Sequence, residues 1–264
     1  MSAAESAELA QIVHRDGFVV LPKEPFAVSE SIVTLVRTQV LNLYEELMTE
    51  AANRQLDFKL CEHAERLLGF YVRQGGRIDM QLRSSAFRLP SMETVNSVDM
   101  KLLKNMVATW RCVLTELFAP DNFRLEYIGC VLSRPGDADQ NWHLDGVHRN
   151  QQVQEPVDRL NVFVPLVAIT DQTGGTEMKT GSHNHKSGAR GKAFEGYKDL
   201  PSVTAYVEAG TPIIMDYRVW HRGLANTSES TVRPLLYFKY AKMAAAMVVK
   251  ALTKKRKRIT PMVV

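Results

Sequence analysis

Two histidines and one aspartate have the residue types and the order of a metal site. His143 and Asp145 form a His-x-Asp pair at the end of a predicted β-run, and His221 follows a second apolar run at 213–217. Side chains at positions i and i+2 of an extended chain project to the same face, so the imidazole and the carboxylate can converge on one ion. Two histidines and one carboxylate leave further positions on the metal open, as non-haem Fe(II) oxygen chemistry requires.

A distal arginine strengthens this interpretation, because the chain has seven histidines and a His-x-Asp pair alone is weak evidence. Arg233 lies in the apolar run 232–238, where a charge is costly unless it is paired. A planar guanidinium can hold a carboxylate through two hydrogen bonds. The pattern favours an anchor for a carboxylate ligand, and an internal ion pair with one of the 29 acidic residues is the alternative.

The elements that must position these residues differ between the two halves of the chain. Apolar residues recur at helical spacing over 4–15, 28–52 and 97–118, with Ser29 as the expected N-cap of the second helix. A short strand is expected at 17–21. Short β-rich runs, separated by Gly and Pro turn signals, then follow at 124–132, 160–168, 175–179, 203–207, 211–216 and 232–240.

Short strands at this density, without helices between them, favour a sandwich or barrel over a parallel α/β sheet. We predict a mainly β fold with α additions, a double-stranded β-helix (a cupin-like jelly roll) with a helical N-terminal half. We expect a single domain over 1–264, because the chain has no internal repeat or low-complexity linker. Its expected parts are a helical cover at about 1–122, a jelly-roll core at about 123–240, and a C-terminal helix with a basic tail at 241–264.

The composition is that of a globular protein in a reducing compartment. Three scattered cysteines form no Cys-x-x-Cys pair, which argues against a disulfide framework or a thiolate zinc site. The net charge is +4, of which the run 254–258 supplies +5, so the rest of the chain sums to −1 and does not resemble a nucleic-acid-binding body. We find no secretory signal, membrane span or C-terminal peroxisomal tripeptide, and expect an intracellular, cytoplasmic protein.

Four motifs in this order resemble the phytanoyl-CoA dioxygenase family. They are a Gln-x-x-His-x-Asp pattern at 140–145, a Gly-Ser-His segment at 175–183, the run 210–226 around His221, and Arg233. The match covers roughly residues 124–240, and Gly-Phe-Val-Val at 17–20 resembles the family's opening segment. Thr180 replaces the usual proline before Gly-Ser-His, a departure that should only relax a turn.

The resemblance implies roles for the individual residues. His143, Asp145 and His221 would bind Fe(II), and Arg233 would bind the distal carboxylate of a 2-oxoglutarate co-substrate, with O2 as the oxidant. A small residue in place of Asp145 would leave room for halide and indicate a halogenase. With the carboxylate present, the expected reaction is hydroxylation of an unactivated C–H bond of a small organic or acyl-type molecule, with release of succinate and CO2.

Two further residues match co-substrate contacts of relatives. Gln140 lies three residues before His143, where several relatives contact 2-oxoglutarate, and Thr176 matches a threonine with a similar part in fungal-type members. His183 and His185 are expected to be structural or surface residues, because the ligand set is already complete. A group of arginines reads as a solvated basic stretch rather than as a receptor for an anionic substrate: Arg73, Arg77, Arg83 and Arg88.

Three alternatives stay open at this stage. A cupin-like metalloenzyme that does not use 2-oxoglutarate would need the metal ligands but not Arg233. A catalytically silent regulatory protein could bind metal and 2-oxoglutarate without consuming the 2-oxoglutarate. The third alternative is a nucleic-acid or membrane protein whose function depends on the basic run 254–258. For the segment itself, a helix at 241–252 packed on the domain with a frayed basic tail is favoured over contact with an anionic membrane surface or a nuclear signal. We expect a small-molecule substrate and no nucleic acid, and the sequence does not indicate an oligomeric state.

Overall fold

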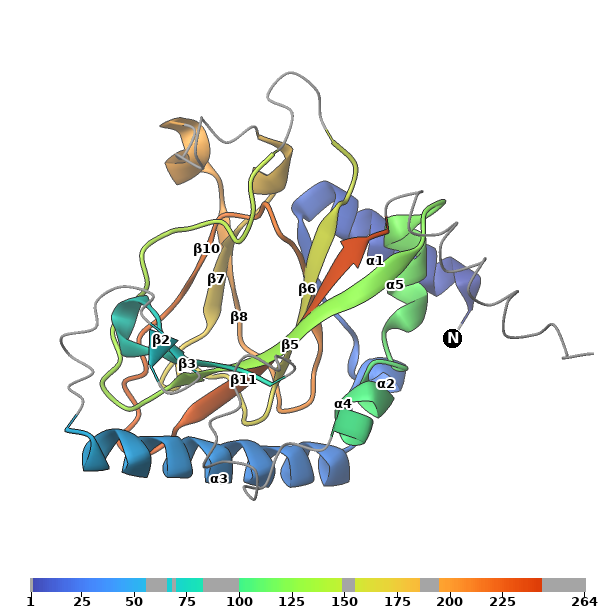
Figure 1. The fold of residues 1–264 in the computed structure, drawn as a ribbon. Coiled ribbons are helices and arrows are strands. Elements are labelled where there is room, and N and C mark those ends of the chain that lie inside the picture. The colour runs from blue at the N-terminus through green and yellow to red at the C-terminus, as the bar shows by residue number, and fades with distance from the viewer. Residues whose placement is uncertain are drawn as a thin grey trace, which may run out of the picture.

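The computed structural model contains two antiparallel β-sheets, with helices packed against one side of the larger sheet (Figure 1). It describes residues 2–55, 66–67, 70–82, 100–148, 155–185 and 195–243. The larger sheet has the strand order β1-β9-β6-β11-β5-β4-β3-β2, and the smaller sheet has the order β10-β7-β8. This arrangement confirms the predicted double-stranded β-helix with α additions.

The helices of the described chain are α1 (Ala3–Asp16), α2 (Lys23–Phe26), α3 (Glu30–Asn53), α4 (Met100–Met106) and α5 (Arg111–Phe118). The strands of the larger sheet are β1 (Phe18–Val20), β2 (Arg66–Leu67), β3 (Phe70–Val72), β4 (Ile78–Gln81), β5 (Phe123–Ser133), β6 (Arg159–Pro165), β9 (Ile213–Asp216) and β11 (Arg233–Lys242). Those of the smaller sheet are β7 (Thr176–Lys179), β8 (Ser202–Ala205) and β10 (His221–Gly223).

The N-terminal helix α1 begins and ends at strong local signals. Ser2 and Glu5 form a capping box, in which each side chain accepts a hydrogen bond from the backbone N–H of the other residue. Gly17 closes the helix with a φ of 92°, a left-handed conformation that glycine adopts without strain. The chain then turns directly into β1, which pairs with β9.

Two hydrophobic clusters lie on opposite faces of the larger sheet. The cluster on the helix side joins α1, α3, α4 and α5 to sheet residues such as Cys130, Leu236 and Phe238. The second cluster lies between the two sheets and includes Phe163 and Leu235 from the larger sheet. Because side chains alternate along a strand, β11 directs Leu236 and Phe238 to the helices and the odd-numbered residues to the space between the sheets.

The long helix α3 runs along one side of the β-layer (Figure 1). It buries Val33, Val36, Val40 and Leu47 at helical spacing. Ser29 precedes the helix as expected, but its side chain makes no capping hydrogen bond and its hydroxyl lies 3.3 Å from that of Ser31. Packing of the apolar face, rather than the cap, therefore holds the helix in place.

Several details differ from the sequence prediction. The helix expected at 97–118 is divided into α4 and α5 by a turn at 107–110. The supposed helical cover also contributes β2, β3 and β4 to the larger sheet, and the periodicity of the sequence did not indicate these short strands. Ala241 and Lys242 end β11 rather than beginning a helix, because they pair with Arg124 and Phe123. The remainder of the predicted C-terminal helix and the run 254–258 lie outside the described residues.

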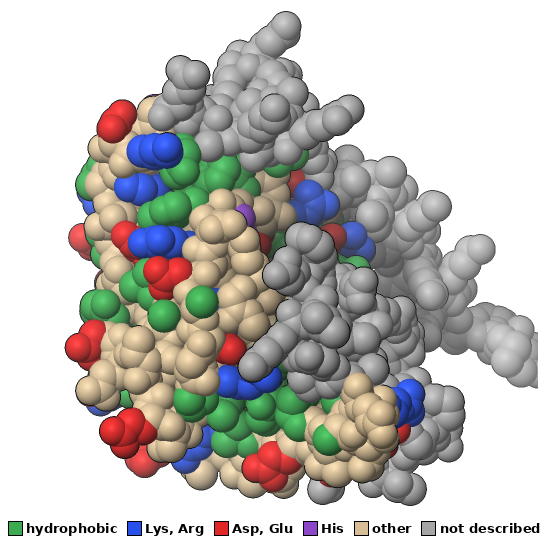
Figure 2. Space-filling view, turned by 90° about the vertical axis from the view of Figure 1, so that its left-hand side faces the viewer, with side chains coloured by type: hydrophobic (Ala, Val, Ile, Leu, Met, Phe, Trp, Pro, Cys, Tyr) green, Lys and Arg blue, Asp and Glu red, His purple; other side chains and the backbone are tan. Residues whose placement is uncertain are grey.

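On the face of the molecule shown in Figure 2, acidic and basic side chains are interspersed with hydrophobic ones. Within the described part of the chain, each helix is too short or too polar to span a bilayer.

Candidate metal centre and co-substrate pocket

The two candidate histidine ligands lie side by side because their backbones pair. The N–H of His143 donates to the carbonyl of His221, and the N–H of His221 donates to the carbonyl of His143, both at 3.0 Å. Their rings lie 4.3 Å apart between centroids. The sequence predicts His221 at the end of the strand-like run 213–217. The chain instead turns after β9, and His221 opens β10 in the smaller sheet.

One ring nitrogen of each histidine is held by a backbone carbonyl, which leaves the other for a metal. Nδ1 of His143 lies 2.9 Å from the carbonyl oxygen of Asn141, and Nδ1 of His221 lies 3.0 Å from that of Val219. A carbonyl only accepts, so both Nδ1 atoms donate and both Nε2 atoms present a lone pair. The ligand atoms of His143, Asp145 and His221 all lie within 4.8 Å of one another.

The protonation of this cluster suits a divalent cation. Burial, together with the neighbouring His221, lowers the pKa of His143 to about 4, although the carboxylate of Asp145 acts in the opposite direction. The imidazole is therefore neutral at physiological pH, as metal binding requires. Asp145 is oriented by Asn161, whose side-chain amide donates a 2.6 Å hydrogen bond to Oδ2 of the carboxylate. This set of donors fits an iron ion.

Aromatic packing supports the backbone on which the ligands lie. Trp220 stacks on Tyr197 at 4.8 Å, and its backbone N–H donates to Oγ of Ser182 at 2.9 Å. Trp142 lies below the guanidinium of Arg222 at 4.9 Å. The tryptophans next to His143 and His221 thus fix the chain on either side of the cluster.

Two buried arginines lie close together on the inner side of the site. Arg233 is 2% exposed and donates from Nη1 to the carbonyl oxygen of Gly174. Arg77 is 1% exposed and donates to the carbonyl oxygens of Ala138 and Leu224 at 2.7 and 2.6 Å. Within the described residues, the Nε atoms of both guanidinium groups are buried without a hydrogen-bond partner.

The two guanidinium groups are under electrostatic stress. Burial, together with the charge of Arg77, lowers the pKa of Arg233 to about 10, and burial also lowers the pKa of Arg77. Both remain protonated at neutral pH, and a buried cation without a counter-ion is costly. An anion with two carboxylate oxygens would compensate both groups.

Gly223 contacts Gln140, lies next to Arg77 and pairs with Thr176 on the neighbouring strand. Its backbone N–H donates to Oε1 of Gln140 at 3.0 Å, and it accepts from the N–H of Gln140 at 2.9 Å. A Cβ atom at Gly223 would lie 2.8 Å from Oε1 of Gln140 and 3.1 Å from Nε of Arg77, so only glycine leaves room for both. Thr176 is the register partner of Gly223 on β7 and is buried.

A single cavity of about 1150 Å³ connects the metal cluster with the arginines. Every site residue predicted from the sequence lines it: His143, Asp145, His221, Arg233, Gln140 and Thr176. Its lining also includes Tyr127, Tyr217, Tyr237 and Lys239. Arg73 and Asp79 also line it, and Nε of Arg73 donates to Oδ2 of Asp79 at 2.9 Å.

The favoured interpretation of the arginine stretch was wrong for Arg77, which is buried in the cavity rather than solvated. Arg73, in the same stretch, is half-exposed and paired with Asp79, while Arg83 and Arg88 lie outside the described residues. Of the two histidines set aside, His185 is exposed, whereas His183 is 3% exposed and lies 3.1 Å from the carbonyl oxygen of His14. Asn161 was not singled out, and only its alternation with Leu160 and Val162 in an apolar strand marks it.

Comparisons with known proteins agree with this geometry. The family model described as phytanoyl-CoA dioxygenase matches residues 13–234. Among solved structures, the non-heme alpha-ketoglutarate-dependent carbocyclase SnoK from nogalamycin biosynthesis is 17% identical with a TM-score of 0.62, covering 91% of this chain and 86% of its own. AviO1 from Streptomyces viridochromogenes Tue57 is 18% identical with a TM-score of 0.59, covering 93% and 98%.

A third similar structure is EctD from S. alaskensis with 2-oxoglutarate and 5-hydroxyectoine. It is 17% identical with a TM-score of 0.57, and the alignment covers 91% of this chain and 76% of that one. At these identities the structures show a shared fold, whereas the family match extends over most of the chain.

Proposed function

The chain belongs to the phytanoyl-CoA dioxygenase family of Fe(II)- and 2-oxoglutarate-dependent oxygenases, and we propose that it hydroxylates an unactivated C–H bond of a small organic substrate. In this proposal His143, Asp145 and His221 bind the iron. One observation carries it: the three ligand atoms lie within 4.8 Å of one another in the same cavity as two arginines with unsatisfied buried Nε atoms.

The bound iron supplies the redox chemistry that couples oxidative decarboxylation of 2-oxoglutarate to oxidation of the substrate by O2. The chain's own residues determine where this takes place. His143, Asp145 and His221 would hold the iron and would leave further coordination positions for co-substrate and oxygen. The hydrogen bonds from each Nδ1 to a carbonyl, and from Asn161 to Asp145, fix the direction of every ligand.

The co-substrate is held by the arginine end of the cavity in this proposal. Arg233 binds the distal carboxylate of 2-oxoglutarate through its guanidinium group. Arg77 lines the same part of the cavity and adds a second positive charge that attracts this carboxylate. Gln140 and Thr176 line the same wall around Gly223. Binding of 2-oxoglutarate adds a negative charge beside two guanidinium groups whose Nε atoms have no hydrogen-bond partner among the described residues, so co-substrate binding relieves an unfavourable feature of the free protein.

The overall reaction takes 2-oxoglutarate, O2 and a substrate R–H to succinate, CO2 and R–OH. A carboxylate at position 145 occupies the ligand position that halide would need, which supports hydroxylation over halogenation. Apolar residues between the sheets, including Phe163 and Leu235, line the cavity and exclude water from the reacting centre.

The direct test is succinate formation from 2-oxoglutarate by the iron-loaded protein. His143→Ala and Asp145→Ala are expected to abolish it, and His185→Ala, which alters an exposed histidine, is the matched control. Turnover in either ligand variant after removal of adventitious iron would contradict the ligand assignment. Binding of Fe(II) and 2-oxoglutarate by the wild type without succinate formation would identify a catalytically silent protein instead.

A further inference from the structure

A positively charged residue, Lys239, lines the cavity far along β11 from Arg233. Along β11, alternate residues turn to the cavity: Arg233, Leu235, Tyr237 and Lys239. Lys239 lies six positions after Arg233 on the extended chain, which corresponds to about 20 Å. The strand therefore presents two cations to the cavity at widely separated positions, Arg233 and Lys239.

Lys239 lies at the same height in the sheet as the metal cluster, one strand away from the residue that holds Asp145. Its register partner on β6 is Asn161, the residue whose amide holds Asp145. The Cβ atoms of directly opposed residues are about 5 Å apart. The ring of Tyr217 lies 4.8 Å from Nζ of Lys239, and the same ring covers Gly146, next to Asp145. A group bound to Lys239 is therefore a short distance from the iron ligands.

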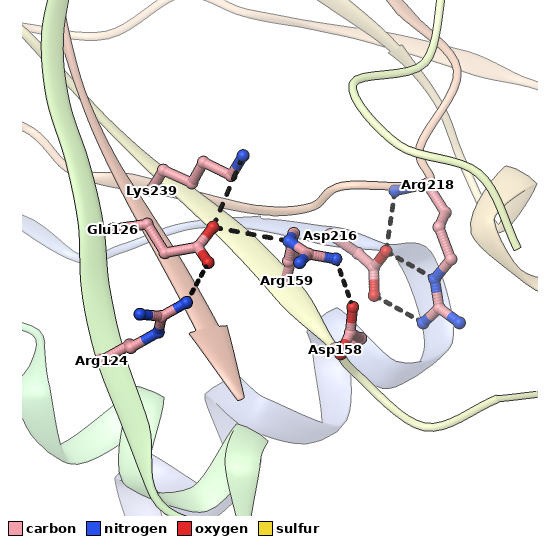
Figure 3. Close-up of polar contacts among 7 residues, drawn as sticks. All are labelled: Arg124, Glu126, Asp158, Arg159, Asp216, Arg218 and Lys239. Atoms are coloured by element: carbon pink, nitrogen blue, oxygen red, sulfur yellow. Dashed lines mark hydrogen bonds and ion pairs between the residues drawn. The ribbon is translucent and has the colours of Figure 1, made fainter. Parts of the chain in front are cut away.

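The charge of Lys239 is only partly compensated. Its side chain is 18% exposed, and its Nζ lies 3.5 Å from Oε2 of Glu126 (Figure 3). The same carboxylate also pairs with Arg124 at 2.9 Å and with Arg159 at 3.5 Å. One carboxylate thus faces three cations, of which Arg159 also pairs with Asp158 at 2.7 Å. Nζ also lies over the faces of two tyrosine rings, which stabilise a cation without neutralising it.

A β-bulge in the sheet accounts for the direction of the Glu126 side chain toward Arg124, Arg159 and Lys239. Lys239 pairs with Tyr127 and the next residue, Tyr240, pairs with Leu125, so Glu126 has no register partner on β11. Bulges of this kind redirect side chains next to active sites. Because Glu126 serves three cations from the bulge, Lys239 is not required as its counter-ion.

The cavity as a whole remains cationic when iron and co-substrate are counted. Among the described residues, its charged lining consists of four cations and two carboxylates: Arg73, Arg77, Lys239, Arg233, Asp79 and Asp145. Fe(II) and doubly ionised 2-oxoglutarate cancel each other, so the lining keeps an excess of two positive charges, which the carboxylate of Glu126 partly offsets from outside the lining. Arg73 is paired with Asp79 at 2.9 Å, whereas Lys239 has only a longer contact of 3.5 Å with Glu126. Among the described lining residues, Lys239 is therefore the cation next to the metal cluster that is best placed to bind a further anion.

We propose that the prime substrate is an organic anion whose carboxylate or phosphate group binds Lys239, with an apolar or aromatic body between Tyr217 and Tyr237. This inference rests on the proposed function, since it places the substrate beside the same metal cluster. The anionic group lies within a few bonds of the oxidised carbon, because Lys239 is level with Asn161 and Asp145.

The test measures binding to the enzyme loaded with Fe(II) and saturating 2-oxoglutarate in the absence of oxygen. Calorimetric titrations compare phenylacetate and indole-3-acetate with phenylacetamide and indole-3-acetamide, and phenyl phosphate separates phosphate from carboxylate recognition. The acids are expected to bind at least tenfold more tightly than their amides. Lys239→Met should remove this preference, Lys239→Arg should keep it within about threefold, and Lys242→Met is the control, since that lysine on the same strand pairs with Asp121.

Three outcomes would overturn the inference. The first is equal binding of acids and amides, or no binding of any acid, while 2-oxoglutarate binds normally. The second is an acid preference that survives Lys239→Met in a variant whose melting temperature matches the wild type. The third is acid binding that competes with 2-oxoglutarate, which would place the acid at Arg233. Failure of the wild type to bind 2-oxoglutarate at all would instead overturn the proposed function, and this inference with it.

Discussion

The side-chain amide of Asn161 donates to Oδ2 of Asp145, the same oxygen that lies 3.9 Å from Nε2 of His221. Asn161 belongs to the larger sheet and His221 to the smaller one. The carboxylate is therefore held at the point where the two sheets meet, by a buried residue that is not itself a ligand. Its orientation depends on how the sheets pack as well as on the local chain.

Removing this hydrogen bond should weaken metal binding without removing a ligand. Asn161→Ala frees the carboxylate to rotate, and loss of an outer partner of a metal ligand typically costs about 10–100-fold in affinity. Equilibrium dialysis with Fe(II) under anaerobic conditions measures the effect. Asn42→Ala, on the exposed side of α3, is the control. An Asn161 variant with wild-type affinity would show that Asp145 is oriented by other contacts.

Binding of 2-oxoglutarate should stabilise the protein through Arg233. At a concentration 100 times the dissociation constant, a ligand that binds only the folded state adds about 2.7 kcal/mol. For a domain of this size, that corresponds to a rise in melting temperature of roughly 5–10 °C. Arg233→Met should lose this rise, and Arg54→Met, an exposed arginine paired with Glu50, should keep it. An undiminished rise in the Arg233 variant would mean that this residue has a structural role only.

A methyl group at Gly223 should weaken co-substrate binding by displacing Gln140 and Arg77, which line the cavity. Gly223→Ala brings a Cβ atom to 2.8 Å from Oε1 of Gln140 and to 3.1 Å from Nε of Arg77. We expect the KM for 2-oxoglutarate to rise about tenfold, a loss of about 1.4 kcal/mol. Gly136→Ala offers a contrast, because its Cβ meets nothing within 4 Å although its φ is 85°. That variant should lose stability but keep the KM, and an equal KM in both variants would contradict the prediction.

The stability of the metal-free protein should fall at mildly acidic pH, and His183 should contribute. Burial lowers the pKa of His183, against the opposing charge of Asp216 and a contact with the carbonyl of His14. The unfolded chain therefore takes up a proton at a pH where the folded chain does not. The group has no effect above about pH 6.5, and below it reduces the unfolding free energy by up to about 1.4 kcal/mol per pH unit.

His183→Gln isolates this contribution, because the other buried histidines are present in both proteins. Chemical denaturation between pH 8 and pH 5.5 should give a shallower loss of stability in the variant than in the wild type. Parallel profiles would show that His183 titrates normally in the folded state.

Much of the candidate site could be predicted from the sequence because it consists of short motifs that follow one another in a fixed order along the chain. The His-x-Asp pair and the order of His221 and Arg233 predict a candidate metal cluster and a candidate anion site, and the structure brings all of these residues to one cavity. The strands of the jelly roll were marked by short apolar runs between turns. The strand β10 was missed because three residues around a histidine carry no periodic signal.

The remaining residues depend on tertiary contacts that the sequence does not encode locally. Arg77 is buried only because loops far away in the sequence supply the carbonyls of Ala138 and Leu224. Lys239 resembles a solvent-facing lysine in an apolar strand until its register with Asn161 is known. Burial and register, rather than residue type, separate these residues from ordinary surface cations.

Anaerobic titration of the wild type and His221→Ala with Fe(II) and 2-oxoglutarate is the most direct test of the central claim. The visible absorption band of the Fe(II)–2-oxoglutarate chelate reports both components at once. We expect the wild type to develop the band with one equivalent of each and His221→Ala to develop none. No band in the wild type, or an undiminished band in His221→Ala, would contradict the assignment of this cluster as the iron site.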